Sequence, residues 1–294
     1  AYLEMLKRHL GAFDHSFTTV AGDEARLARA ALEAGADTVA AVGGDGTWSQ
    51  VADQVASWQQ RPVRLALLPS GTGNDFGRNL GLTYESPEDA VRALARGRTR
   101  RVDVGRVLTP CAPDGRREQV DALRPRHFLN VVGFGFDIAV IDAAAGARFL
   151  KGAVLYRVTA LQQLFRYPGI DVTVSSPAHG TRAGQRLMLT ISNGRYFGGG
   201  FPIVPAATVD DGFLHACVIS DASPLRRAVL FSRTERGRHV GAPEVELLAD
   251  RRFTVRFPPA ASPPRFEIDG DIYAGVGPEV EVELLPGALE VVVP

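Results

Sequence analysis

The stretch Thr38-Val39-Ala40-Ala41-Val42-Gly43-Gly44-Asp45-Gly46-Thr47 decides the fold of the first part of the chain. It begins with the residues of a short buried strand and ends in a glycine-rich turn. Apolar residues at helical spacing follow (Trp48, Val51 and Val55), so the turn joins a strand to a helix. Glycines let the backbone approach an anion, and N–H groups at a helix start point towards phosphate oxygens. The turn predicts a phosphate site, although an ordinary strand–helix turn also uses glycine and aspartate.

A second buried strand, Val63 to Leu68, ends in Pro69-Ser70-Gly71-Thr72-Gly73-Asn74-Asp75-Phe76. Strands that alternate with helices predict a doubly wound, mainly parallel α/β sheet, in which ligands bind beyond the carboxyl ends of the strands. We therefore expect the two glycine-rich turns to face one crevice. Neither turn is followed by the lysine of a P-loop, and the dinucleotide fingerprint is missing. A kinase built on these turns must rely on metal ions and backbone donors.

The residue pattern of the sequence changes after about residue 105. From there on, strand-like segments recur between prolines and glycines. Several alternate apolar and polar residues, a pattern typical of an antiparallel sandwich. One helix, about Leu150 to Phe165, is expected among them. The expected strands are Phe128–Val132, Ile170–Val174, Leu187–Ser192, Leu214–Ile219, Arg252–Phe257, Arg265–Ile268, Val280–Leu284 and Leu289–Val293.

We therefore predict two domains with a cleft between them. Residues 1–105, with a strand at about 286–294, form an α/β nucleotide-binding domain. Residues 106–285 form an all-β sandwich domain.

Composition excludes several classes of protein. The 294-residue chain has 45% hydrophobic and 22% charged residues, which are values of a globular protein. Its 33 basic residues balance 33 acidic ones, so we do not expect a nucleic-acid partner. Cys111 and Cys217 suggest neither a disulfide framework nor a cysteine metal cluster. We expect neither a membrane span nor a secretory signal, and predict a cytoplasmic protein.

A series of motifs in order along the chain resembles the diacylglycerol kinase catalytic domain family, which includes bacterial soluble lipid kinases and sphingosine and ceramide kinases. The resemblance covers almost the whole chain, and the ordered series is far more specific than any single motif. It implies an ATP- and magnesium-dependent transfer of the γ-phosphoryl group to the hydroxyl of a diacylglycerol-like lipid, with the lipid bound by the β domain. The motifs are Gly43–Thr47, Pro69–Phe76, Asp103–Gly105, Asn130–Asp137, Ser192–Gly194, Pro205–Leu214, Phe266–Asp271 and Leu285–Pro294.

The resemblance also assigns ATP-binding and magnesium-binding residues by position. Asp45, Asp75 and Asp103 match acidic positions of a water-bridged network around magnesium, and clustered carboxylates in a cleft need a cation. Asp103 taken alone would equally fit a solvated loop. The expected ATP contacts are Thr18, Gly43, Gly44, Asp45, Gly46, Thr47, Trp48, Ser49, Gly71, Thr72 and Asn74.

The turn Asp210-Asp211-Gly212 resembles a structural magnesium site of related bacterial kinases. The resemblance assigns the ligands to the Asp211 carboxylate and to the carbonyl groups of Thr208 and Phe213. Hard oxygen ligands from one tight loop suit a hard divalent ion. A plain β-turn explains the same three residues almost as well.

The turn Asp269-Gly270-Asp271 is the candidate catalytic pair, because phosphoryl transfer needs a group that orients the attacking hydroxyl and takes its proton. The family usually has Asp-Gly-Glu here. The shorter Asp271 side chain moves the carboxylate by about 1 Å, a displacement that can matter a hundredfold. Either Asp269 or Asp271 therefore remains a candidate for the base. The family also begins with a strand and an Asn-Pro-x-x-Gly turn, which we expect to precede residue 1 in the natural protein.

Other functions stay open. NAD kinases and phosphofructokinases also carry a Gly-Gly-Asp-Gly turn, and a non-catalytic lipid- or nucleotide-binding module would explain the altered Asp271. The second glycine-rich turn together with Asp269–Asp271 favours the lipid kinases. The expected partner is a lipid at the membrane surface, with peripheral membrane association, and the family suggests a possible homodimer. We expect the acyl chains near Phe134, Phe136, Phe197 and Phe201.

Overall fold

A computed structural model describes residues 2–20, 22–71, 73–82, 84, 86–114, 123–145, 152–259 and 263–294 of the chain. The first part contains α1 (Tyr2–Leu10), α2 (Asp23–Glu33), β1 (Thr38–Gly43), α3 (Asp45–Ser57), β2 (Arg64–Pro69), α4 (Asp75–Leu80), α5 (Pro87–Arg96) and β3 (Thr99–Pro113). The second part contains β4 (Arg124–Phe128), β5 (Val131–Gly135), α6 (Phe136–Ala145), α7 (Gly152–Arg166), β6 (Ile170–Ser176), β7 (Gly180–Ser192), β8 (Tyr196–Phe197), β9 (Phe201–Pro202), β10 (Leu214–Ser220), α8 (Pro224–Thr234), β11 (Val245–Asp250), β12 (Arg252–Arg256), β13 (Arg265–Ile268), β14 (Asp271–Gly275) and β15 (Glu279–Val292).

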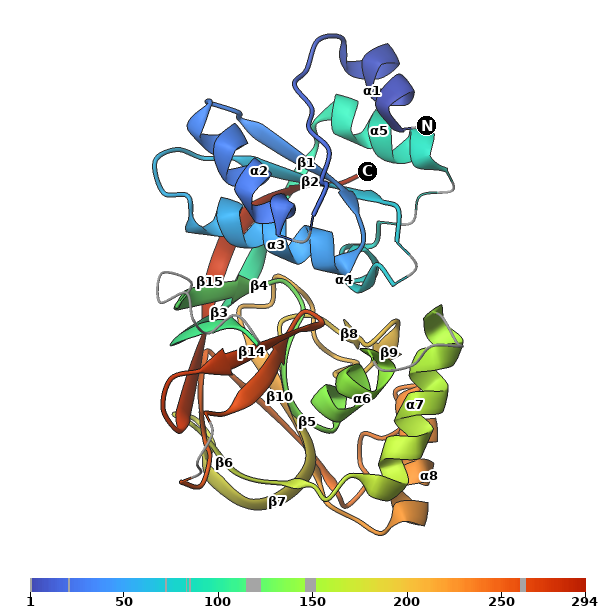
Figure 1. Ribbon diagram of the computed structural model, residues 1–294, viewed down its shortest axis with the longest axis vertical. Coiled ribbons are helices and arrows are strands. Elements are labelled where there is room, and N and C mark those ends of the chain that lie inside the picture. The colour runs from blue at the N-terminus through green and yellow to red at the C-terminus, as the bar shows by residue number, and fades with distance from the viewer. Residues whose placement is uncertain are drawn as a thin grey trace.

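The first part is an α/β layer structure, as predicted (Figure 1). Strand β1 pairs in parallel with β2, and β2 pairs in parallel with the end of β15. Alternate residues of β2 point to opposite faces of the sheet. Leu65 and Leu67 share a core with α2 and α3, whereas Leu68 packs with α1 and α5. Helices therefore cover both faces of β2, which explains why this short strand is almost continuously apolar, whereas Ala40 and Val42 of β1 are exposed.

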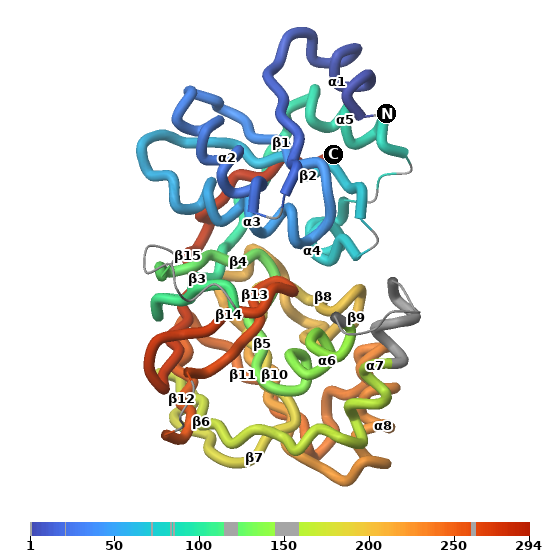
Figure 2. The backbone as a smooth tube through the Cα atoms, viewed as in Figure 1, coloured from blue at the N-terminus to red at the C-terminus, as the bar shows by residue number. Residues whose placement is uncertain are grey.

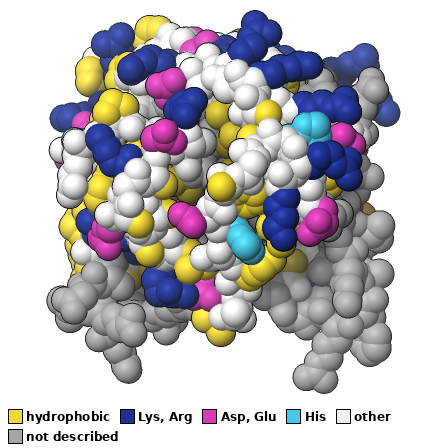
Figure 3. Space-filling view, turned by 90° about the horizontal axis from the view of Figure 1, so that it is seen from above, with side chains coloured by type: hydrophobic (Ala, Val, Ile, Leu, Met, Phe, Trp, Pro, Cys, Tyr) yellow, Lys and Arg dark blue, Asp and Glu magenta, His cyan; other side chains and the backbone are white. Residues whose placement is uncertain are grey.

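Charged side chains of both signs lie on the end of the molecule that the first part forms. Figure 3 shows Lys and Arg side chains there among Asp and Glu side chains, with apolar side chains between them. Some form ion pairs along one helix, such as Arg29 with Glu33 on α2 and Arg92 with Glu88 on α5. These exposed pairs contribute little stability.

Two long strands, β3 and β15, run from the first part into the second (Figure 1). They pair antiparallel from Thr99 with Val292 to Val107 with Val282, with a register shift between Leu285 and Leu289. The segments that the sequence suggests as two final strands therefore form one strand. The expected domain boundaries near residues 105 and 286 fall inside these continuous strands.

The β part differs from the predicted sandwich in one respect. Hydrogen bonds join β15, β12, β6, β7, β5, β13, β14 and β3 in that order, and β3 pairs with β15 again. The described strands thus form a closed ring instead of two separate sheets, because β3 and β15 are long enough to pair beyond the α/β part. Strands β10 and β11 extend outwards from β7. The ring encloses an apolar core that includes Phe134 and Phe266, whose ring centroids are 5.8 Å apart.

The expected strand at Phe128–Val132 is interrupted. Strand β4 ends at Phe128 and β5 begins at Val131, with Leu129 and Asn130 between them. The carboxylate of Asp269 accepts the N–H groups of Leu129, Asn130 and Val131, so these donors do not take part in a continuous ladder. None of the helices in the described ranges combines the length and the apolar character that a membrane span needs.

Candidate active site

The two glycine-rich turns lie against each other at the carboxyl ends of β1 and β2. Gly43 is the register partner of Pro69, and the N–H of Ser70 donates to the Gly43 carbonyl at 2.8 Å. A Cβ atom on Gly71 would lie 2.7 Å from the Cα of Gly44. Gly71 therefore needs glycine because of this close approach of the two backbones, whereas a Cβ atom on Gly44 would lie 3.3 Å from the Cα of Gly71. The structure thus places the two turns in contact at one edge of the sheet.

Asp45 connects the two turns. It is the first residue of α3, and its Oδ1 accepts the N–H of Phe76 in α4 at 3.2 Å. A Cβ atom on Gly73 would lie 2.7 Å from Asp45 Oδ2, so glycine is needed there also. Asn74 has a left-handed backbone (φ 55°) and donates its side-chain amide to the Gly71 carbonyl at 3.0 Å. The second turn is thereby held in shape by its own polar side chains.

Two of the expected ATP contacts are directed elsewhere. Trp48 is buried in the α/β core, where its indole N–H donates to the Ala41 carbonyl at 3.2 Å. Ser49 is buried as well, and its side chain hydrogen-bonds the carboxylate of Asp269. Both side chains are therefore engaged within the protein. The helical spacing that places Trp48 with Val51 in the core could have shown this from the sequence.

The remaining expected ATP residues are spread over the same edge. The side chain of Thr47 covers Gly43, whereas a Cβ atom on Gly46 would have no other atom within 4 Å. Gly46 thus marks the open part of the turn at the start of α3. Thr18 is exposed in the extended segment before α2. Thr72 lies outside the described residues.

Asp75 and Asp103 are both buried, and each accepts backbone N–H groups. Asp75 bonds the N–H of Gly199 at 2.7 Å and pairs with Arg78 at 2.7 Å. Burial raises the pKa of Asp75, and the negative charge of Asp45 raises it further. Asp103 accepts the N–H groups of Gly212 at 2.8 Å and Gly287 at 2.7 Å, so it ties the turn before β10 to the bulge in β15.

The three acidic residues predicted for a water-bridged magnesium network differ in what they bond. Within the described ranges, no group of three or more His, Cys, Asp or Glu side chains could hold a metal ion. Asp103 uses both oxygens for backbone N–H groups, whereas Asp45 and Asp75 interact electrostatically with each other.

The Asp211 turn uses its predicted ligand atoms internally. The carboxylate of Asp211 accepts the N–H groups of Thr208 and Phe213, each at 3.0 Å, and lies 3.0 Å from Nε2 of His215. The Thr208 carbonyl accepts the N–H of Asp211 at 3.3 Å. This arrangement matches the plain turn, and the magnesium site stays a prediction.

Asp269 is buried between β13 and β14 with a left-handed backbone (φ 47°), which is strained for a residue with a Cβ atom. Its carboxylate accepts three N–H bonds, at 2.8 Å from Leu129, 2.9 Å from Asn130 and 3.0 Å from Val131. Burial raises the pKa of Asp269 to about 6, although these donors lower it in part. The side chain therefore fixes the hairpin of residues 269–271 to the segment between β4 and β5.

Asp271 begins β14 and is exposed. Its carboxylate accepts the side-chain N–H of Gln50 at 3.0 Å, and the same amide lies 3.2 Å from the Tyr273 hydroxyl. Partial desolvation raises the pKa of Asp271; the Gln50 hydrogen bond lowers it, and the charge of Glu24 raises it. Gln50 is a site residue that the motifs missed. It lies one helical turn after Gly46, so helical spacing was the available signal.

Comparisons with known proteins define the class. A model of the diacylglycerol kinase catalytic domain matches residues 1–107, and a model of the YegS C-terminal NAD kinase beta sandwich-like domain matches residues 130–293. The fold and the facing turns thus belong to a kinase with an α/β catalytic domain and a β domain. The chain is a member of the diacylglycerol kinase and YegS-like lipid kinase family, as its motifs predict, and is therefore an ATP-dependent lipid kinase.

Individual relatives agree with this membership. A diacylglycerol kinase of Mycobacterium tuberculosis is 28% identical over 274 residues, covering 93% of this chain and 82% of that protein. A probable YegS-like lipid kinase of Chromohalobacter salexigens is 33% identical over 209 residues, covering 70% of this chain and 61% of that protein. The structure of a diacylglycerol kinase from Bacillus anthracis str. Sterne has the same fold, with a TM-score of 0.66 at 18% identity, covering 99% and 88% of the two chains.

Two glycine substitutions test the wall of the site. Gly71→Ala should lower both thermal stability and ATP affinity, because its Cβ would push the backbones of the two turns apart. Gly46→Ala should leave stability unchanged or slightly higher, since its Cβ meets open space and alanine favours a helix by about 1 kcal/mol. Thermal melts and ATP titrations measure both. Full ATP affinity in Gly71→Ala would contradict the contact between the turns.

Proposed function

We propose that this lipid kinase transfers the γ-phosphoryl group of ATP, with Mg²⁺, to the hydroxyl group of a diacylglycerol-like lipid, and that Asp271 is the base. The hydrogen bond between Gln50 and Asp271 carries the proposal. Gln50 belongs to the helix whose start forms the first glycine-rich turn. At 1.5 Å per residue, Asp45 and Gln50 are about 7.5 Å apart along α3, so the Asp271 carboxylate is near the place expected for the γ-phosphate.

The phosphates bind over the open turn at Gly44 to Gly46, where N–H groups at the start of α3 point outwards. Asp45 and Asp75 hold the magnesium ion at their shared edge, directly or through water. When bound, the ion neutralises charge that develops on the phosphate oxygens. The like-charge interaction between Asp45 and Asp75 supports this placement.

The surroundings of the two aspartates favour Asp271 over Asp269 as the base. Asp269 is buried and accepts three backbone N–H bonds, so its lone pairs are engaged. Asp271 is exposed and bonds one amide, which leaves oxygen lone pairs for a substrate hydroxyl. Asp271 orients the lipid hydroxyl and accepts its proton, the hydroxyl oxygen bonds to the γ-phosphorus, and the bond to ADP breaks.

The alternative functions are not favoured. An NAD kinase or a non-catalytic module was considered because of the Gly-Gly-Asp-Gly turn and the altered Asp271. The catalytic-domain match and the relatives named as lipid kinases favour the lipid kinase. Asp271 also keeps a partner on α3 despite its shorter side chain.

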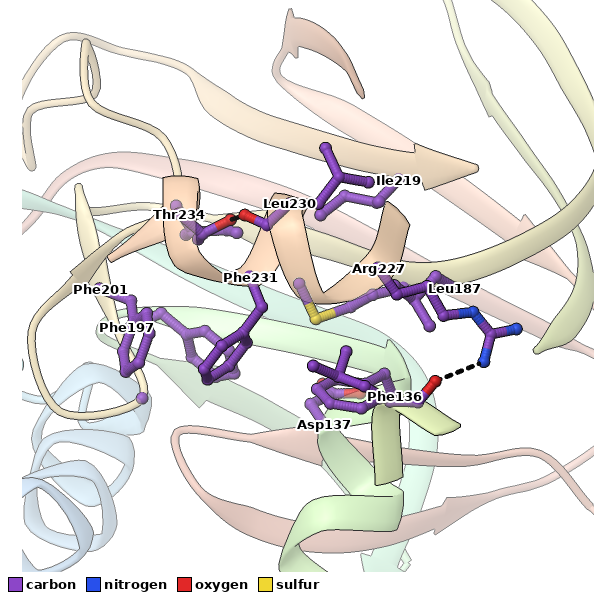
Figure 4. Close-up of a pocket in the computed structure, with 14 residues that line it drawn as sticks. Phe136, Asp137, Leu187, Phe197, Phe201, Ile219, Arg227, Leu230, Phe231 and Thr234 are labelled. Atoms are coloured by element: carbon purple, nitrogen blue, oxygen red, sulfur yellow. Dashed lines mark hydrogen bonds between the residues drawn. The ribbon is translucent and has the colours of Figure 1, made fainter. Parts of the chain in front are cut away.

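An apolar cavity between α6, α7, α8 and the outer face of β7 and β10 is the proposed acyl site (Figure 4). Its volume of about 50 Å³ is smaller than that of a usual ligand pocket, so an acyl chain enters only if the lining side chains move apart. Phe136, Phe197 and Phe201 line it as expected, whereas Phe134 lies inside the strand ring. The other lining residues are Asp137, Leu164, Leu187, Met188, Gly198, Ile203, Ile219, Arg227, Leu230, Phe231 and Thr234.

Peripheral membrane association is proposed from the helices that border this cavity. Leu161 and Phe165 on α7 and Leu225 and Val229 on α8 are exposed, with Leu225 76% accessible. The two helices lie side by side (Figure 1), and other residues of both, Leu164 of α7 and Leu230 of α8, line the cavity. Exposed apolar side chains beside a ligand cavity are typical of an interaction surface. A lipid could pass from a membrane against this surface into the cavity.

Replacement of Asp271 by Asn should lower kcat at least about 100-fold with little change in melting temperature, because proton transfer loses its acceptor. Wild-type kcat should fall as pH decreases through the raised pKa of Asp271, since only the carboxylate accepts a proton. Radiolabelled ATP with diacylglycerol in mixed micelles measures both.

Asp269→Asn should instead destabilise the fold by about 1–3 kcal/mol, because an N–H donor loses its acceptor. Normal turnover by Asp271→Asn would exclude this base.

Filling the cavity should change the KM for the lipid and leave the KM for ATP unchanged. Met188→Trp adds bulk to the cavity wall and should raise KM for long-chain diacylglycerol several-fold, while KM for ATP stays constant. Val276→Trp is the matched control, because Val276 is exposed in the turn between β14 and β15. Equal lipid kinetics in the two variants would show that acyl chains bind elsewhere.

Negative charge on α7 should weaken binding to membranes. Leu161→Glu and Phe165→Glu should each reduce sedimentation with vesicles of phosphatidylcholine, phosphatidylglycerol and diacylglycerol, because a carboxylate cannot enter the apolar layer without cost. Val276→Glu provides a control with the same charge change. Undiminished vesicle binding by both α7 variants would exclude this surface.

A further inference from the structure

Three buried polar side chains surround Gly133 on the outer face of the strand ring. Glu267 of β13 and Thr190 of β7 are its register partners on either side, and directly opposed residues share one face of a sheet. Asp137, in the first turn of α6, covers the same glycine. A Cβ atom on Gly133 would overlap the Asp137 carboxylate and lie 2.9 Å from Cγ of Glu267. Figure 2 shows α6 next to β5 and β13. We call Asp137, Thr190 and Glu267 the Gly133 cluster.

The cluster contains polar atoms without partners. Asp137 is 1% exposed and Glu267 and Thr190 are 0% exposed. Both carboxylate oxygens of Asp137, Oε1 of Glu267 and the Thr190 hydroxyl oxygen lack a hydrogen-bond partner among the described residues. Unpaired buried carboxylates are costly, and two of them side by side cannot both stay ionised. A proton between the two carboxyl groups would satisfy one oxygen of each with an O–H···O bond.

The expected ionisation agrees with this geometry. Burial raises the pKa of Asp137 to about 7, although the N–H groups of Asp137 and Ile138 at the start of α6 lower it in part. Burial also raises the pKa of Glu267 well above its usual range, and the charge of Asp137 adds to the effect. The two groups therefore titrate as a pair, and burial favours its protonated form.

The pair is connected to the Asp269–Asp271 hairpin. Oε2 of Glu267 accepts the N–H of Gly270 at 2.7 Å. Gly270 has a φ of 96° and follows the strained Asp269, so the hairpin depends on this acceptor. On its other side, Asp137 lines the apolar cavity (Figure 4). The Gly133 cluster thus lies between the proposed acyl site and the proposed base.

We propose that Asp137 and Glu267 share one proton and together act as positioning residues that hold the Asp269–Gly270–Asp271 hairpin in the geometry needed for phosphoryl transfer. The effect on turnover rests on the proposed kinase reaction, whereas the shared proton does not. When the shared proton leaves, the two carboxylates repel and Glu267 moves from Gly270. Turnover therefore falls as pH rises through the upper ionisation of the pair.

Other charged groups near the pair set the direction of this titration. The negative charges of Asp269 and Asp271 on the hairpin oppose ionisation of Glu267. Tyr167, which follows α7, interacts electrostatically with Asp137, and burial together with Asp137 raises the pKa of its hydroxyl group. Arg227 of α8 lines the same cavity, but its guanidinium pairs with Asp221 and donates to backbone carbonyl groups. The balance of these charges favours the protonated pair.

Two substitutions at Glu267 separate positioning from packing. In Glu267→Gln the amide oxygen can accept from Gly270 and the amide N–H can donate to Asp137, so the variant imitates the protonated acid at every pH. Its kcat should stay close to that of wild type at neutral pH and lose the fall at alkaline pH. Glu267→Leu fills the space without an acceptor and should lower kcat about 10- to 100-fold with an unchanged KM for ATP. Glu281→Gln on β15 is the control and should keep the wild-type pH profile.

The shared proton has a readout that does not depend on turnover. The infrared carbonyl band of a protonated carboxyl group should be present in wild type at neutral pH, disappear as pH rises, and be missing in Glu267→Gln. If wild type shows this band but phosphorylates no lipid, the kinase reaction fails and the shared proton stands. If the band is missing in wild type, or if Glu267→Gln keeps the alkaline fall in kcat, the proposal is wrong.

Discussion

The buried carboxylate of Asp53 on α3 fixes the two parts of the molecule to each other. It accepts the N–H of His127 at 3.0 Å, lies 3.0 Å from Nδ1 of the same residue, and pairs with Arg124. Burial raises the pKa of Asp53, but hydrogen bonds from His127 and Arg124 lower it to about 2 overall. Ser49 and Gln50 lie on the same face of α3 and bond the Asp269–Asp271 hairpin. Removal of one partner from a buried ion pair is strongly destabilising. These bonds therefore hold α3, with the glycine-rich turn at its start, in a fixed position relative to the hairpin.

Local features of the site could be predicted because each depends on a few neighbouring residues. The strand, the glycine-rich turn and the helix around Gly43–Thr47 follow from composition and spacing, and the structure has them. The partners of the carboxylates could not be predicted in this way. Asp103 accepts the N–H of Gly287, which is 184 residues away in the sequence. Its neighbours in the sequence do not indicate this bond, so the motif predicts only a place in the magnesium network, whereas in the structure Asp103 joins two turns. Glu267 lies between two apolar residues in the sequence, a pattern that is typical of a strand residue facing solvent. In the structure α6 packs against β13, and Glu267 is buried.

The closed strand ring was missed for a related reason. Pro286-Gly287 interrupts the apolar pattern, which favours a loop between two strands. In the structure the interruption is a register shift within one strand of 14 residues, and the N–H of Gly287 donates to Asp103. Proline has no N–H, so its place at this irregular point loses no ladder hydrogen bond. A strand of that length spans about 45 Å, enough to pair with β2 at one end and with β12 at the other.

The acidic residues of the crevice therefore divide by what they bond. Asp45, Asp75 and Asp269 accept backbone N–H groups from a segment distant in sequence, so each holds a turn in place. Glu267 does the same for Gly270 within its own hairpin. Such a carboxylate is restrained. Asp269 accepts N–H groups on both oxygens, so an asparagine there would place its amide N–H against one of these donors. Asp271 instead bonds one side-chain amide at the surface, and this difference in bonding separates the group that can accept a proton from those that position it.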